Sequence, residues 1–70
     1  MSLLQDLISE DFGLEGRNRW HHAGEHDSLV YDSENDFFFW NSQNLKGGAL
    51  EYLMQVRGME KSEARNFLNN

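Results

Sequence analysis

One short stretch of the chain combines positive charge with an aromatic ring: residues 17–22 read Arg-Asn-Arg-Trp-His-His. Arginine contacts phosphate oxygens, and an indole ring stacks on a nucleobase. The pattern indicates a nucleic-acid contact. The residues that would carry it are Arg17, Arg19, Trp20 and His22. The alternative is a solvated loop with a tryptophan in the core, whose arginines pair with Glu15, Glu25 or Asp27.

A further basic residue, Lys46, precedes two glycines at the expected start of a helix. Backbone N–H groups and the helix dipole at such a start bind phosphate, so Lys46 joins the candidate nucleic-acid-binding residues. The glycines are equally explained by a tight turn and close packing of the helix on a sheet. We favour this packing explanation, because the GxxxxGK pattern of phosphate-binding loops is absent.

The stretch around the histidines is also rich in side chains that bind metals: His21, His22, Glu25, His26 and Asp27. Zinc is one interpretation of such a set. Against it, Ala23-Gly24 disfavours the helix that would align His22 with His26. Donor-rich loops also commonly carry no metal. We therefore expect no metal and no other cofactor.

Enzymatic chemistry finds little support in the sequence. No cysteine is present, and no serine lies in a nucleophile-elbow motif. The paired acids Asp32 and Glu34 fall in a predicted turn, where charge runs are usually solvated. A domain this small rarely builds a dry, preorganised pocket. We expect a protein that is not an enzyme.

The length and composition indicate one small domain. Seventy residues without cysteine allow neither a disulfide nor a thiolate zinc site. Nine residues are aromatic, and Phe37 to Trp40 are consecutive. Each buried aromatic contributes roughly 2–3 kcal/mol. An aromatic core is therefore expected to replace the metal or disulfide that stabilises many domains of this size.

The net charge is −6, with 12 acidic and 6 basic side chains. Such a charge repels nucleic-acid phosphate and anionic membranes, so a nucleic-acid contact must depend on a local patch. No apolar run approaches the ~20 residues that span a bilayer, and the N-terminus lacks a secretory signal pattern. We expect a cytoplasmic protein with no membrane partner.

The hydrophobic pattern predicts an α+β fold. Its expected elements are helices over residues 2–12, 47–57 and 60–69, strands over 28–31 and 36–41, and a polar hairpin loop over 32–35. The segment 13–27 reads as polar and interrupted by glycine, with Trp20 on a short strand. Leu29 and Tyr31 are expected on one sheet face.

The aromatic strand needs cover on both faces, because four rings in a row point to both sides of a strand. Its exposed part is a candidate surface for a protein partner or for a homodimer. In the helices, Leu50, Leu53, Met54, Ala64, Phe67 and Leu68 are expected to face inward.

Five pieces of the sequence occur in an order known from one family. They are Gly16-Arg17-Asn18, Ser28-Leu29-Val30, Phe37 to Trp40, Gly47-Gly48-Ala49-Leu50-Glu51-Tyr52-Leu53-Met54, and Glu63-Ala64. This order resembles the N-terminal zinc-ribbon (CHC-type zinc finger) domain of bacterial DnaG-type DNA primases, over roughly residues 6–68. The resemblance implies a small zinc-ribbon-like antiparallel sheet with an N-terminal helix and two C-terminal helices.

The resemblance places the four zinc-ligand positions of the family at Arg19, His22, Trp40 and Gln43. Only His22 is able to bind zinc, so the resemblance implies a metal-free relative in which Trp40 fills the former knuckle.

Two functional hypotheses follow from the sequence. The first is a non-catalytic, nucleic-acid-binding accessory module of a primase, replication or mobile-element protein, with single-stranded DNA as its partner. The second is an acidic protein–protein interaction module, for docking, dimerisation or inhibition, which kept the fold and lost DNA binding.

Overall fold

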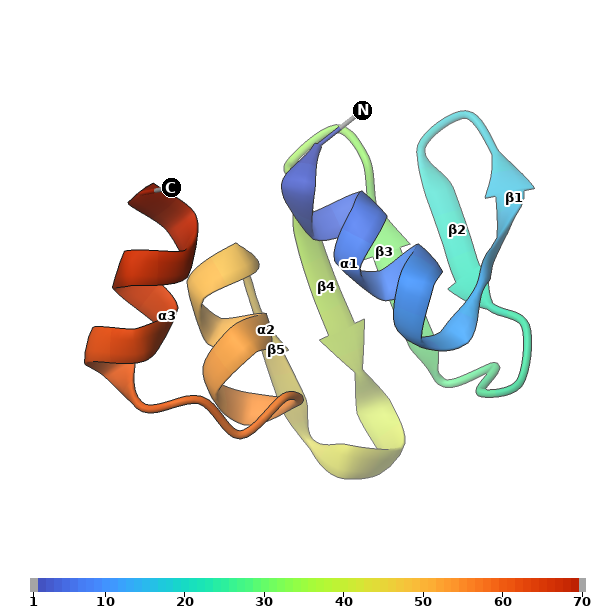
Figure 1. Cartoon of the computed structure of the whole chain (residues 1–70). Helices are drawn as coiled ribbons and strands as arrows, with labels where there is room; N and C mark the ends of the chain where they lie inside the picture. Colours follow the sequence, from blue (N-terminus) through green and yellow to red (C-terminus); the bar gives the residue numbers. More distant parts are fainter. Residues whose placement is uncertain (1, 70) are drawn as a thin grey trace.

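The computed structural model describes residues 2–69 and has an α+β fold (Figure 1). The elements in chain order are α1 (Leu3–Phe12), β1 (Leu14–Arg17), β2 (Trp20–Ala23), β3 (Leu29–Asp32), β4 (Phe37–Trp40), a 3-10 turn (Asn41–Gln43), β5 (Leu45–Gly47), α2 (Ala49–Gln55) and α3 (Lys61–Asn69). The predicted arrangement of an N-terminal helix, an antiparallel sheet and two C-terminal helices is confirmed.

The sheet is a meander in which each strand pairs with the next one along the chain, in the order β1-β2-β3-β4-β5. The register pairs His21 with Tyr31, Tyr31 with Phe38, and Phe38 with Gly47. Successive residues of a strand point to opposite faces, so these positions share one face. Leu29 and Tyr31 lie on this face and are buried, as predicted.

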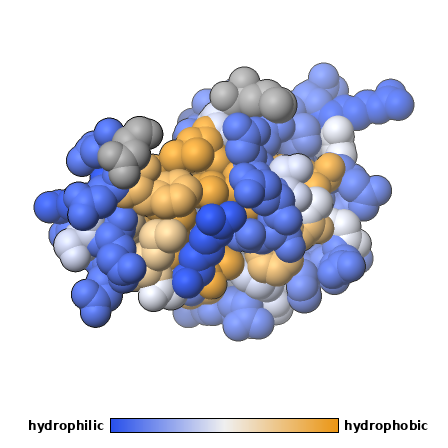
Figure 2. All heavy atoms as spheres, in the orientation of Figure 1, coloured by the Kyte–Doolittle hydropathy of each residue, from blue (hydrophilic) through white to orange (hydrophobic). Residues whose placement is uncertain are grey.

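The hydrophobic core lies between this sheet face and the helices. It contains Leu4, Leu7 and Ile8 of α1, Ala23, Leu29, Tyr31 and Phe38 of the sheet, Tyr52 and Leu53 of α2, and Ala64 of α3. The Phe38 and Tyr52 rings meet edge to face, with their centroids 5.4 Å apart. In Figure 2, apolar atoms gather in the part of this side that lies between α1 and α3.

Local sequence signals explain the ends of the first two helices. The Ser2 hydroxyl caps α1 by accepting a hydrogen bond from Gln5 N at 3.0 Å, and Gly13 ends it with φ 73°. At the start of α2, the Glu51 carboxylate accepts a hydrogen bond from Gly48 N at 2.7 Å.

Several element predictions were wrong. Trp20 lies on a short strand, β2, as predicted, but the segment 13–27 also contains the unpredicted strand β1, which pairs with β2 in a hairpin. The polar stretch after β4 contains the unpredicted strand β5. Asp32, expected in a loop, ends β3 and is 2% exposed. Phe67, expected to face inward, is 38% exposed, because α3 packs mainly on α2 and buries only Ala64 fully.

Within residues 2–69, no helix has the length and apolar character needed to cross a membrane.

Candidate nucleic-acid interface

The sheet face opposite the helices carries no helix within the described residues, and we call it the open face. Helix α1 contacts β1 and β2, α2 contacts β5, and α3 contacts α2 (Figure 1). All of the hydrophobic core lies on their side of the sheet. By alternation, the open face consists of Glu15, Arg17, Trp20, His22, Val30, Asp32, Phe37, Phe39 and Lys46.

Aromatic rings occupy this face at two places. The Phe37 and Phe39 rings of β4 lie 5.4 Å apart and are partly exposed. The Trp20 ring of β2 is 50% exposed. In the register, Asp32 lies between Trp20 and Phe37, and Val30 lies between His22 and Phe39. The open face therefore offers ring surface to a ligand on β2 and on β4, on either side of β3.

The open face is electrostatically balanced, whereas the rest of the molecule is acidic. With Arg19 and Glu34, which reach it from the adjoining turns, this face has three acidic and three basic side chains. The other nine acidic and three basic side chains therefore carry the whole net charge of −6. Arg17 and Lys46 are exposed and form no ion pair with residues 2–69.

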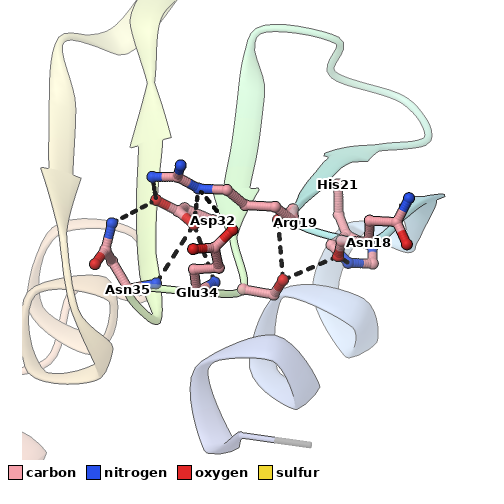
Figure 3. Close-up of polar contacts among 7 residues, drawn as sticks. Asn18, Arg19, His21, Asp32, Glu34 and Asn35 are labelled. Atoms are coloured by element: carbon pink, nitrogen blue, oxygen red, sulfur yellow. Dashed lines mark hydrogen bonds and ion pairs between the residues drawn. The ribbon is translucent and has the colours of Figure 1, made fainter.

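Arg19 is held by a buried carboxylate (Figure 3). Its Nε and Nη2 atoms donate hydrogen bonds to the two oxygens of Asp32 at 2.9 and 3.0 Å. The same carboxylate accepts hydrogen bonds from Asn35 Nδ2 at 2.9 Å and from the Glu34 backbone N–H at 3.0 Å. A bidentate arginine–carboxylate pair of this kind is among the strongest hydrogen-bonded contacts in proteins.

The ion pair changes the acidity of both partners. The Arg19 hydrogen bonds hold the pKa of Asp32 well below its ordinary value, against the burial that would raise it. The hydrogen bonds to Asp32 in turn raise the pKa of Arg19. Both groups are therefore charged throughout the range in which the protein is expected to work.

Two hollows adjoin the aromatic rings. One, of about 460 Å³, is lined by Trp20, His21, His22, Asp27 and Val30. The other, of about 260 Å³, is lined by Phe39, Trp40, Asn41, Asn44, Leu45 and Lys46. Val30 and Phe39 are cross-strand neighbours, so the hollows lie on adjacent strands. Aromatic, amide and cationic groups line the second hollow, which is the chemistry that contacts nucleobases and phosphates. The first hollow is lined by an indole, two imidazoles, an aliphatic side chain and the Asp27 carboxylate.

The structure brings together four of the five residues predicted to bind nucleic acid: Arg17, Trp20, His22 and Lys46 lie on the open face. Arg19 differs, because its guanidinium binds Asp32 and lies 3.7 Å from Glu34. The alternative prediction paired the arginines with Glu15, Glu25 or Asp27, which was wrong, because Arg19 binds Asp32 instead. It also placed Trp20 in the core, which was wrong, because this residue is half exposed.

The four positions aligned with zinc ligands do not meet. Arg19 lies with Asp32 at the end of the sheet where Asp32 pairs with Phe37. Trp40 pairs with Leu29 three residues along β4, on the opposite face, and Gln43 follows it in the 3-10 turn. The Trp40 ring packs against Phe12 and His26, with centroids 5.3 and 5.5 Å away.

The donor-rich stretch does not assemble a metal site. Within the described part of the chain, no three histidine, cysteine or acidic side chains are grouped to hold a metal ion. His21 points to the helix side, where its Nε2 lies 3.1 Å from the Asn18 carbonyl oxygen. His22 lies on the open face, and His26 packs against Phe12 with ring centroids 5.2 Å apart.

Five residues of the open face were not predicted to bind nucleic acid: Glu15, Val30, Asp32, Phe37 and Phe39. The two phenylalanines belong to the aromatic strand, whose exposed part was instead a candidate surface for a protein partner. Alternation could have identified the two phenylalanines. Leu29 and Tyr31 pair with Trp40 and Phe38, so all four face the helices, and Phe37 and Phe39 must face the other way. Nothing in the run Asp-Ser-Glu-Asn marks Asp32 as buried, because its partner Arg19 lies 13 residues earlier.

Comparison with known proteins gives one short match. No protein-family model and no solved structure matches the chain. An uncharacterized protein of Bacillus anthracis, pXO2-78, is 34% identical over 38 residues. These residues are 54% of this chain and 11% of that protein, so the match spans a small part of the relative.

Proposed function

We propose that the open face binds single-stranded nucleic acid and that the chain is a non-catalytic binding module. The observation that supports this most is the placement of Trp20, Phe39, Arg17 and Lys46 together on a sheet face without a covering helix. Sheets with exposed rings bind single strands by stacking bases on them, while cations contact the backbone.

The geometry suggests how many nucleotides fit. Four inter-strand spacings across the sheet measure roughly 19 Å. A four-stranded RNA-binding sheet stacks about two or three bases. Trp20 and Phe39 lie on β2 and β4, with β3 between them. We therefore expect a site of roughly three nucleotides that runs across the strands.

The charge distribution sets the expected strength of binding. Arg17 and Lys46 have no acidic partner within residues 2–69, whereas the rest of the molecule repels phosphate. Long-range repulsion weakens with salt, but so do the phosphate contacts themselves. The balance favours weak binding that falls with salt and gains most of its free energy from stacking.

The test is fluorescence anisotropy of a labelled oligothymidine at low salt. Arg17→Ala and Lys46→Ala are each expected to weaken binding and to reduce the slope of log affinity against log salt by about 0.7. Trp20→Ala is expected to weaken binding by roughly tenfold, because it removes a stacking surface.

The chain offers matched controls on α3. Arg65→Ala and Lys61→Ala remove the same charges from exposed positions away from the sheet, and Phe67→Ala removes an exposed ring. These variants should bind like the unmodified chain. Equal losses from the two sets, or no binding at micromolar protein, would refute the proposal.

A protein partner is the second candidate function. Leu3 of α1 and Phe67 of α3 are 42% and 38% exposed, and Figure 2 shows apolar surface between these two helices. Large exposed apolar patches mark protein contacts. Light scattering separates the two candidates, because a dimer held by these residues would dissociate in Leu3→Ser while oligonucleotide binding persisted. The setting in a primase, replication or mobile-element protein stays a prediction.

A further inference from the structure

We infer that Arg19 is a positioning residue for Trp20 and does not itself bind phosphate. This inference rests on the proposed function, in which Trp20 is the principal stacking surface. It changes the role expected for Arg19 from the sequence, where its charge suggested a contact with the nucleic-acid backbone.

The first step is the position of the Arg19 side chain. Its guanidinium carbon lies 4.7 Å from the centroid of the Trp20 ring, within the range of a cation–π contact. The guanidinium therefore covers one side of the indole. Trp20 remains 50% exposed, so ring surface is still available to a base. The arrangement prepares a stack of guanidinium, indole and base.

The second step is what fixes the guanidinium. Both of its hydrogen bonds go to Asp32, which is 2% exposed and lies directly across from Trp20 in the β2–β3 register. Asn35 and the Glu34 backbone hold the carboxylate from the other side. The orientation of the Arg19 guanidinium is thereby set by a buried carboxylate that is itself hydrogen-bonded to the following turn.

The third step concerns the backbone of Arg19. Its carbonyl oxygen accepts hydrogen bonds from the Ser33 backbone N–H at 2.8 Å and from the Ser33 hydroxyl at 3.0 Å. These bonds join the β1–β2 turn to the β3–β4 turn (Figure 3). The residue before Trp20 is therefore fixed at both its main chain and its side chain, which limits the motion of the indole.

The fourth step is the competition that a phosphate would face. A phosphate on the Nε–Nη2 edge of Arg19 would have to displace Asp32 and leave a buried carboxylate without its cation. A phosphate on the remaining N–H groups would lie near two negative charges, those of Asp32 and of Glu34, whose carboxylate is 3.7 Å from Arg19 Nε. Arg17 and Lys46 carry no such partners within residues 2–69. Phosphate contact therefore falls to those two residues.

The decisive substitution is Arg19→Lys, which keeps the positive charge and removes the planar fork. Positioning predicts roughly tenfold weaker binding of the oligothymidine with an unchanged salt slope. Arg17→Ala is the matched comparison, because it should reduce the slope. Wild-type affinity in Arg19→Lys would overturn the inference.

The direction in which Asp32→Asn changes the affinity for oligothymidine distinguishes the two roles of Arg19. If Arg19 positions Trp20, this variant weakens binding, because the fork loses its anionic anchor. If Arg19 binds phosphate, the variant strengthens binding, because it releases the guanidinium. Circular dichroism verifies that the variant is folded, and Arg19→Lys decides the question if it is not.

A ligand-free measurement separates this inference from the proposed function. In a Trp40→Phe background, Trp20 is the single tryptophan, so steady-state fluorescence anisotropy reports its mobility. Arg19→Lys should lower that anisotropy, and Arg17→Ala should not. If Arg19→Lys lowers the Trp20 anisotropy but the parent chain binds no oligonucleotide, the proposed function is refuted and the positioning role stands. Unchanged anisotropy would refute the positioning role alone.

Discussion

At the scale of single residues, the environment of Asp32 decides how its neighbours behave. The run Asp-Ser-Glu-Asn predicts a solvated turn, yet its first residue is buried against Arg19. The basic and aromatic residue types in 17–22, and an expected helix start after Lys46, gave the candidate site residues Arg17, Trp20, His22 and Lys46. These signals could not reveal the Arg19–Asp32 pair, because a long-range ion pair leaves no periodic signal.

The lowered pKa of Asp32 makes stability depend on pH. The folded chain holds this carboxylate ionised below the ordinary value of 3.8, so its contribution is complete above that value. The contribution is lost as the pH falls through 3.8 toward the folded pKa. We expect the melting temperature to fall on acidification from about pH 6 to about pH 2.5.

Asp32→Asn should flatten that fall, because asparagine does not titrate. Asp11 provides a comparison: burial alone would raise its pKa, but the Arg57 and Tyr52 hydrogen bonds outweigh burial and lower it. Asp11→Asn should therefore flatten the profile as well. Circular dichroism measures the melting temperature of each variant against pH. Equal profiles for Asp32→Asn and the unmodified chain would contradict the lowered pKa of Asp32.

At the scale of elements, the sequence predicted the helices and the β3–β4 hairpin, and it missed β5. Helices and strands with a clear period bury one face, and that period is visible in the sequence. Strand β5 has only three residues, and pairing with β4 decides its conformation. The β1–β2 hairpin was predicted as one short strand, because its residues are polar and mostly exposed.

The β1–β2 hairpin depends on a glycine. Gly16 has φ 140°, and a Cβ atom there would lie 2.5 Å from the Trp20 carbonyl oxygen of β2. Gly16→Ala is expected to lower the free energy of unfolding by about 1–3 kcal/mol, through backbone strain and the clash. Urea denaturation measures the loss.

Gly24→Ala is the control for that variant. Gly24 has an ordinary φ, and its nearest atom is the flexible Glu15 carboxylate at 3.1 Å. This substitution should change stability little. A cost for Gly24→Ala equal to that for Gly16→Ala would show that the strain at Gly16 is not the cause.

At the scale of the whole molecule, the two faces of the sheet serve different purposes. Aromatic packing was predicted to stabilise this cysteine-free chain, and Phe38 and Tyr52 are fully buried. The four consecutive rings of β4 were predicted to need cover on both faces, with their exposed part as a candidate surface for a protein partner. Within residues 2–69, no helix covers the face that carries Phe37 and Phe39. The rings Phe37 and Phe39 cover each other partly.

Neighbouring phenylalanines of β4 test this division. Phe38→Ala, in the core, should lower the free energy of unfolding by about 3–5 kcal/mol, enough to unfold most domains of this size. Phe37→Ala, on the open face, should cost roughly 1 kcal/mol or less. Urea denaturation compares them, and similar costs would show that the open face is buried in a self-associated form.

The alternation of the strands has a practical consequence for protein engineering. Inward positions maintain the folded state, whereas outward ones contribute little to it, apart from Asp32 and its anchor. A combinatorial library that randomises Glu15, Arg17, His22, Val30 and Lys46 would therefore retain foldable members in large numbers. Selection from such a library would turn this miniature, disulfide-free sheet into a display scaffold for new binding specificities.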